Sequence, residues 1–463
     1  FSSPVTYTVS NGTESRSYTV SVTNSGLPVA VLEHDGGTVE WAEAGIMIRG
    51  KEEGWGESHF TLYNADGTVD VERALCGSRL RGNSTQNFPK KPFALKFEDK
   101  VGIQGLPTDK RWELLANWMD RTMLRNTVTF EVANKTAGAL ADGLGWNPRG
   151  VNVELVINER HVGNYFLCEK VKIDGDRIDI KDCYEDVVDG GNTNPAVADC
   201  GYLLEFDDAM DEVNTFRTER GLPVMFKDEV PEDGTLFNAV KDKVENIESC
   251  LESGDYSSAY ALLDINSVID WFLVQELVMN DEYKHPKSAY MYIDGDGPLT
   301  AGPVWDFDWQ AFSDKDRIDA LRGGNAYTGR AVNEWLYSAS DLASRWFPNY
   351  NTDQPYMWYP LLFRDETFRS RVQERWPVIY AALQSVPAAI DSFAEKNRVS
   401  DSFNSAMWPL MQEKGRADYS VAFNGDENLS FDESIALMKE VYTERLEWMN
   451  SSITAGNFDT DAE

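Results

Sequence analysis

The strongest constraint on the fold is a change of periodicity partway along the chain. Short β-branched and aromatic runs bounded by turn residues recur from residue 27 to residue 207, which is the pattern of strands. From residue 236 onward, apolar residues recur every three to four positions, which is typical of amphipathic helices. No internal repeat or long linker interrupts the chain. The sequence therefore predicts one α+β body at 27–455, with a β-rich part at about 27–180 and a mostly helical part at about 200–455.

The two ends of the chain differ from this body. Residues 1–26 carry β-branched alternation on both sides of Asn11-Gly12, which predicts two strands joined by a tight turn. Two strands are too few for a stable domain, so we interpret this segment as the remnant of a preceding β-module or as an added edge. Residues 456–463 form a polar tail. Because residue 1 is Phe rather than Met, we expect the chain to be processed or truncated.

Composition excludes several classes of partner. With 43 basic and 77 acidic residues, the net charge of −34 argues against nucleic acid or an anionic membrane as a general partner. No apolar run approaches the roughly 20 residues of a membrane-spanning helix. The five cysteines form no CxxC motif, which argues against structural zinc. Cys183 and Cys200 flank a Gly/Asn-rich loop and would pair if the protein is exported, whereas free buried thiols are the alternative.

The stretch from Leu299 to Phe312 is the first candidate for chemistry. An apolar approach leads to Asp306 and Asp308, which share one face if the backbone is extended. Two anions among aromatic rings are costly to bury unless a cation or a hydrogen-bond network neutralises them. Oxygen ligands of this kind suit a hard divalent ion such as Mg²⁺, Mn²⁺ or Ca²⁺. The alternative is a strand end whose carboxylates face water.

A basic island is the second candidate. The segment from Arg73 to Lys96 contains six basic residues and no acidic one: Arg73, Arg79, Arg81, Lys90, Lys91 and Lys96. Within it, Arg81-Gly82-Asn83-Ser84-Thr85 has the composition of a flexible loop whose backbone N–H groups could approach phosphates. Lysines on the following strand could reach the same phosphates. An ordinary turn is the alternative, because Asn and Ser are common in turns.

Two further carboxylates occupy informative places. A helix predicted at 120–135 aligns Glu131 with its apolar stripe, where a carboxylate needs a basic partner, although an exposed Glu131 is the ordinary reading. Asp281 follows a long apolar helix predicted at 265–278 and precedes a strand at 289–293. It is therefore either a functional carboxylate or a residue that ends a helix or a turn.

Seven short motifs in their order resemble the spore coat protein H (CotH) kinase family. They are Arg81-Gly-Asn-Ser, Pro89-Lys-Lys-Pro-Phe, Leu114-Leu-Ala-Asn, Leu124-Arg-Asn, Glu169-Lys170, Gly201-Tyr-Leu-Leu-Glu and Pro303-Val-Trp-Asp-Phe-Asp. The resemblance implies a protein-kinase-like fold and an atypical, secretory-type kinase. Such an enzyme would transfer the γ-phosphate of ATP to protein serines with the help of a divalent metal. It also implies an exported protein, with association at the cell surface as one possibility.

The resemblance assigns roles to individual residues. Asp306 would be the metal-binding Asp of the kinase DFG element, and Asp281 would accept the proton of the substrate hydroxyl. Lys96 would contact the nucleotide phosphates, with Glu131 as its partner. The remaining assignments are Arg81, Gly82, Asn83 and Ser84 for the loop that covers the phosphates, and Glu169 and Lys170 for the segment nearest the adenine.

One departure from the kinase pattern puts activity in question. A kinase catalytic loop has Asn five residues after its Asp as a ligand of the second metal, and here that position is Pro286. The candidates nearby are His285, Lys287 and Ser288, and Asp308 could supply the missing oxygen. Otherwise the chain would be a catalytically weak or inactive kinase-like surface protein, with a glycan groove lined by Trp305, Trp309 and Trp335 as one variant. A glycosidase built on the two aspartates would leave the basic island unexplained.

Overall fold

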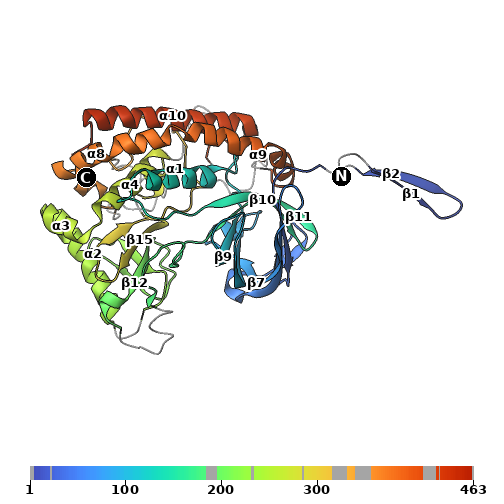
Figure 1. The fold of residues 1–463 in the computed structure, drawn as a ribbon, viewed down its shortest axis with the longest axis horizontal. Coiled ribbons are helices and arrows are strands. Elements are labelled where there is room, and N and C mark those ends of the chain that lie inside the picture. Colours follow the sequence, from blue (N-terminus) through green and yellow to red (C-terminus); the bar gives the residue numbers. More distant parts are fainter. Residues whose placement is uncertain are drawn as a thin grey trace.

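The computed structural model describes residues 5–20, 23–183, 195–230, 234–283, 286–314, 317, 331–338, 356–409, 424–426 and 428–460. A β-barrel and a larger body of helices around a sheet lie side by side, and a two-stranded hairpin projects from the barrel end (Figure 1). The hairpin consists of β1 (Val5–Ser10) and β2 (Ser15–Val20), as the Asn-Gly turn predicts. None of the described helices is long and apolar enough to cross a membrane.

Seven strands close into the barrel in the order β10-β11-β9-β8-β7-β6-β3. Six of the seven pairings are antiparallel, and the parallel pairing of β10 with β3 completes the ring. The strands are β3 (Val29–His34), β6 (Gly56–Tyr63), β7 (Val69–Leu80), β8 (Phe93–Val101), β9 (Asp109–Leu115), β10 (Gly150–Ile157) and β11 (Arg160–Glu169). A small ladder of β4 (Val39–Trp41) and β5 (Ile46–Ile48) adds Trp41 to the barrel core.

The second body is built on a five-stranded antiparallel sheet in the order β13-β14-β12-β15-β16. These strands are β12 (Gly201–Phe206), β13 (Thr215–Arg217), β14 (Pro223–Phe226), β15 (Ala289–Asp294) and β16 (Leu299–Ala301). The described helices are α1 (Arg125–Ala139), α2 (Thr235–Ser253), α3 (Tyr256–Leu262), α4 (Ile265–Leu277), α7 (Tyr359–Leu362), α8 (Glu366–Leu383), α9 (Val386–Met407) and α10 (Phe431–Ala455). Helix α1 follows β9 in sequence but packs against α4, α8 and α9.

Polar caps define where several helices begin. Asp264 accepts a hydrogen bond from Ser267 N at the start of α4, and Asp365 does the same from Phe368 N at the start of α8. Ser430 and Glu433 form a reciprocal capping box at the start of α10. These contacts satisfy backbone N–H groups that an isolated helix would leave unpaired.

Strands β9 and β11 serve two cores at once. Trp112 and Leu114 on β9 point into the barrel, whereas Leu115 belongs to the core of the helical body. On β11, Leu167 faces the barrel and Cys168 faces the helical body. Because side chains alternate along a strand, the outer faces of these strands form the wall between the two bodies.

The predicted α+β class, with a β-rich first part and a helical second part, agrees with the structure. The second part is less purely helical than predicted, since the five-stranded sheet forms its centre. The two alternatives for the cysteines are also decided, because Cys183 and Cys200 form a disulfide. Cys76, Cys168 and Cys250 are free.

Candidate functional site

The loop that follows β16 carries the two predicted metal ligands. Asp306, Gln310 and Phe312 in this loop have φ angles of 70°, 67° and 58°. Left-handed backbone at residues other than glycine is costly and persists only where the surroundings hold it. Several such residues in one short loop therefore mark it as a constrained part of the molecule.

Three buried asparagines hold the backbone of this loop. Asn147 Oδ1 accepts a hydrogen bond from Val304 N at 3.0 Å, and Asn126 Oδ1 accepts one from Phe307 N at 2.8 Å. Asn424 Oδ1 accepts from Gln310 N at 2.5 Å, while its Nδ2 donates to Asp308 O at 2.9 Å. A side-chain amide can accept and donate at once, and so it can replace the strand or helix partners that a loop lacks.

Arg125 fixes the end of the loop. Its Nε donates to Ala311 O at 2.8 Å, and its guanidinium pairs with Asp120 and, at 2.8 Å, with Asp426. All three charged side chains are buried. The motif Leu124-Arg125-Asn126, noted in the sequence without a role, therefore positions the aspartate loop from the start of α1.

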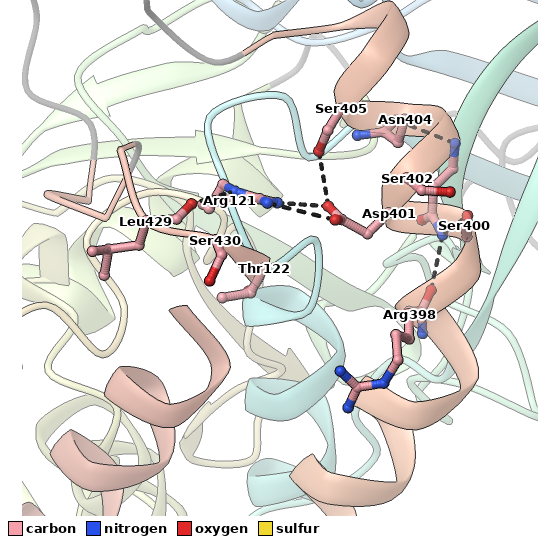
Figure 2. Close-up of polar contacts among 12 residues, drawn as sticks. Arg121, Thr122, Arg398, Ser400, Asp401, Ser402, Asn404, Ser405, Leu429 and Ser430 are labelled. Atoms are coloured by element: carbon pink, nitrogen blue, oxygen red, sulfur yellow. Dashed lines mark hydrogen bonds and ion pairs between the residues drawn. The ribbon is translucent and has the colours of Figure 1, made fainter. Parts of the chain in front are cut away.

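Arg121 connects the same region to the outer helices (Figure 2). Its Nε donates to Leu429 O at 2.9 Å just before α10, and one amino group contacts Asp401 of α9 at 2.6 Å. Ser405 Oγ donates to the same Asp401 carboxylate at 2.8 Å. Residues 424–426 and Leu429 are thus held between the aspartate loop and α9.

Carboxylates gather around Asp306. Asp308 is buried, and burial followed by the charge of Asp306 raises its pKa to about 8. Burial also raises the pKa of Asp306, with a further increase from Asp207. Glu282 has a pKa raised well above its ordinary value by burial and by the charge of Asp306. A cation bound among these four acidic groups would reduce the electrostatic cost of keeping them close together away from water.

Ser288 adds an oxygen to this group of acids. Its Oγ donates to Asp306 Oδ2 at 3.4 Å, and its backbone N–H donates to Asp207 Oδ2 at 3.0 Å. Lys287 next to it pairs with Asp208 at 3.0 Å. Position 288 therefore places a hydroxyl beside Asp306, two residues after the proline at position 286.

The donor set suits a hard cation that is shared with a ligand. Within the described ranges, no three His, Cys, Asp or Glu side chains converge on one ligating point. Mg²⁺ is commonly held by one or two carboxylates while phosphate and water oxygens complete its shell. Asp306 and Asp308, with the Ser288 hydroxyl nearby, fit that incomplete arrangement.

Arg81 joins these acids to the barrel wall. Its Nε lies 2.9 Å from Glu113 Oε2, and its guanidinium lies 5.6 Å from the centre of the Trp305 ring. Burial opposes its charge, yet Glu113 and Asp306 together raise the pKa of Arg81. Lys170 lies 3.7 Å from the same Glu113, and burial lowers its pKa to about 8. A cationic wall therefore faces the aspartate loop.

The other residues predicted around the nucleotide differ in their burial and in their hydrogen-bond partners. Gly82 has a φ of 83°, Asn83 accepts a hydrogen bond from Lys51 Nζ at 3.0 Å, and Ser84 is exposed. Glu169 is buried in a bidentate pair with Arg149. Lys90 of the basic island is also buried, and it donates to the backbone carbonyls of Ala116 and Asn164.

The predicted partnership of Lys96 with Glu131 is wrong. Glu131 pairs with Lys135 at 3.1 Å, one turn later on α1, and about a third of its side chain is exposed at 32%. A partner four residues away on the same helix is closer than one on another strand. Lys96 is exposed on the barrel wall, and the carboxylate that does contact the wall cations is Glu113.

Sequence reasoning named Ser288 only as one candidate near Pro286, and it did not identify Glu113, Asp207 or Glu282 as members of the site. Strand alternation around Trp112 could have suggested that Glu113 faces away from the barrel core. Asp281 opens a short 3-10 turn, Asp281–Tyr283, and its side chain lies outside the described part of the structure. Trp305 and Trp335 are both buried, at 7% exposure, so they do not line an open glycan groove.

Comparison with known protein families identifies the family of the chain. A search of curated proteins gave no match. The sequence profile described as CotH kinase protein matches residues 78–449. This span includes the cationic wall, both aspartates and the asparagines that hydrogen-bond to the aspartate loop. Since this match covers most of its length, the chain belongs to the CotH kinase family.

Proposed function

We propose that the chain is an atypical protein kinase that transfers the γ-phosphate of ATP to serine hydroxyls of a protein substrate with the help of Mg²⁺ or Mn²⁺. The observation that carries the proposal is the position of Arg81. It contacts Glu113 on the barrel wall, and its guanidinium lies 5.6 Å from the ring centre of Trp305, the residue before Asp306 in the opposite loop. Phosphoryl transfer requires cations around the phosphates and acidic oxygens for a metal, and here both lie side by side.

The acidic side of the site would hold the metal. Asp306 and Asp308 would be its ligands, and the Ser288 hydroxyl would stand in for the Asn that Pro286 replaces. When bound, the ion would neutralise negative charge on the transferring phosphate. Binding would also remove the cost of keeping several carboxylates close together, since a cation favours their charged forms.

The cationic side of the site would bind the phosphates. Arg81 and Lys170 would contact phosphate oxygens, and Glu113 between them would orient both side chains. The loop Arg81–Ser84 would cover the phosphates. The backbone of the Glu169-Lys170 segment would lie nearest the adenine, with the side chain of Lys170 directed toward the phosphates. Burial and neighbouring cations lower the pKa of Lys170 to about 8, and a bound phosphate would favour its charged form.

Asp281 is proposed as the base that accepts the proton of the serine hydroxyl. It begins the turn after α4, and its neighbour Glu282 is coupled electrostatically to Asp306. A general base must lie within hydrogen-bond reach of the acceptor hydroxyl in the substrate complex. The proposal for Asp281 rests on this neighbour, because Glu282 in the same turn lies close enough to Asp306 for its pKa to respond to that charge.

Mass spectrometry provides the test of this function. The wild-type protein is incubated with ATP, Mn²⁺ and a serine-rich acceptor protein. The mass of the acceptor should rise by about 80 Da for each phosphoryl group transferred. Asp306→Asn should abolish the addition. Asp66→Asn, an exposed turn carboxylate on the barrel, should leave it unchanged. Equal phosphorylation by wild type and Asp306→Asn would contradict the proposal.

A binding protein without catalytic activity is the second candidate, and Pro286 is the observation that favours it. Loss of the catalytic-loop Asn removes one expected metal ligand. If the Ser288 hydroxyl does not replace it, ATP would bind without transfer. Measurable ATP binding with no phosphoryl transfer to any serine, threonine or tyrosine acceptor would select this candidate.

We further propose that the protein works outside the cytosol. The Cys183–Cys200 disulfide supports this, since disulfides persist mainly in oxidising compartments. The expected partner is a protein that presents serine hydroxyls, and association with a cell surface is compatible with that location.

A further inference from the structure

The barrel wall carries more cations than one phosphate group can use. Strand register defines rows on its outer face, because directly paired residues of neighbouring strands point the same way. One row contains Arg79, Ala94 and Glu113. The next row contains Gly77, Lys96 and Arg111. Together with Arg81 and Lys170, these rows place five cations on the wall around Glu113.

Three of these cations lack an acidic partner. Across the described ranges, no carboxylate forms an ion pair with Arg79, Lys96 or Arg111. Arg79 instead donates to the backbone carbonyl of Lys51 at 2.7 Å. The Nε of Arg111 is buried without a hydrogen-bond partner. Glu113 and Asp109 lie close enough to attract Arg111, but neither forms an ion pair with it, so these cations keep the capacity to bind an anion.

Trp55 holds two of the three in place. The Arg79 and Arg111 guanidiniums lie 4.6 and 4.8 Å from the centre of its ring. Trp55 in turn packs on Gly77, where an added Cβ would approach the Trp55 Cβ to 2.9 Å. Stacking on an aromatic face orients a guanidinium while leaving its N–H edge free to bind an oxyanion.

This group is separate from the one at Asp306. Arg81 is held at Trp305, whereas Arg79 and Arg111 are held at Trp55. Along β7 the row of Gly77 lies four residues from Arg81, which is ~13 Å at the usual rise of a strand. Arg79 is only two residues, about 7 Å, from Arg81 and so borders both groups, whereas a single phosphate group cannot reach from Arg81 to the row of Lys96 and Arg111.

We propose that Arg79, Lys96 and Arg111, supported by Trp55, form a second phosphate-binding subsite on the barrel wall. The ligand is a phosphate group other than the one transferred at Asp306. It belongs either to the nucleotide, as a phosphate nearer the adenosine, or to a phosphoserine already present on the acceptor. The assignment of these two sources rests on the proposed kinase function, whereas the phosphate chemistry of the subsite does not.

Two titrations test the subsite with the full chain. Calorimetry measures ATP with Mg²⁺, and fluorescence anisotropy measures a labelled phosphoserine peptide against its unphosphorylated twin. Arg111→Met and Lys96→Met should each lower the affinity for one of these two ligands about ten-fold. This is the usual effect of losing a charge-assisted hydrogen bond. Lys110→Met, an exposed lysine on the same strand, provides the matched control. Lys96 is exposed, so its substitution does not threaten folding.

The affected ligand identifies the source of the phosphate. Weaker ATP binding alone would support the nucleotide as the source, and weaker phosphopeptide binding alone would support a phosphorylated acceptor. Affinities for both ligands that match those of Lys110→Met would overturn the subsite. If the wild type binds no ATP, the kinase proposal fails, and the phosphopeptide titration still decides the subsite.

Discussion

Asp308→Asn should make the protein more stable, and increasingly so as the pH rises. Asp308 is buried, and its pKa in the folded protein is raised from 3.8 to about 8. The folded state therefore binds a proton more tightly than the unfolded state between these values. Stability contributed by the protonated carboxyl is complete below pH 3.8 and is lost as the pH rises toward 8. Asparagine keeps the shape of the side chain and removes the titration.

The size of the effect follows from the same shift. A pH of 7 is about three units above the pKa of this carboxyl in the unfolded protein. The difference corresponds to ~4 kcal/mol of stability that wild type has lost at pH 7. We expect the melting temperature of Asp308→Asn to exceed that of wild type at pH 7, with a gap that narrows toward pH 4. Scanning calorimetry of both proteins without added metal, from pH 4 to pH 8, measures this gap.

Asp426→Asn provides the matched contrast. Asp426 is also a buried aspartate near the loop, but it pairs with Arg125 at 2.8 Å. Removing one partner of a buried pair costs ~3 kcal/mol or more, so this variant should melt lower than wild type. If Asp308→Asn also melts lower at pH 7, or if its gap to wild type does not change with pH, Asp308 is not held as a strained carboxyl.

Three further predictions concern the loop and the cations. Asn126→Ala removes the hydrogen bond to Phe307 N, so it should cost ~1–3 kcal/mol by chemical denaturation and slow phosphoryl transfer, and unchanged stability would contradict its role. Arg81→Met should weaken ATP binding at least ten-fold in calorimetry, whereas Arg73→Met, whose pair with Glu33 is on the surface, should not; equal effects would refute the assignment. Asp281→Ala should abolish transfer of labelled phosphate while largely sparing ATP affinity, and retained transfer would make Asp281 structural.

The class of the fold could be predicted from local sequence, but the closing of the seven strands into a barrel could not. Period-two and period-3.6 patterns are local properties, so strands before residue 207 and helices after 236 were visible. The closing contact of the barrel pairs Val29 with Glu154, and nothing near either residue encodes that partner. Likewise, α1 follows a barrel strand yet packs on α8, because its buried face matches a surface formed far later in the chain.

The candidate site shows the same limit. The aspartates at 306 and 308 could be predicted because two acids within an aromatic stretch conflict locally unless a ligand resolves them. Arg81 was singled out by its loop and charge island. Glu131 was assigned to the site because helix periodicity aligns it with the apolar stripe, whereas the role of Glu113 depends on strand pairing between β8 and β9. Asn126, Asn147 and Asn424 act through long-range hydrogen bonds that no local pattern announces.

The most direct test of the account is whether ATP binds through both sides of the site at once. Calorimetric titration of ATP, with and without Mg²⁺, should show metal-dependent binding to the wild type. That dependence should be lost in Asp306→Asn, and affinity should fall in Arg81→Met both with and without the metal. ATP affinity that is identical in all three proteins, or that does not respond to Mg²⁺ in the wild type, would contradict a shared metal and phosphate site between Asp306 and Arg81.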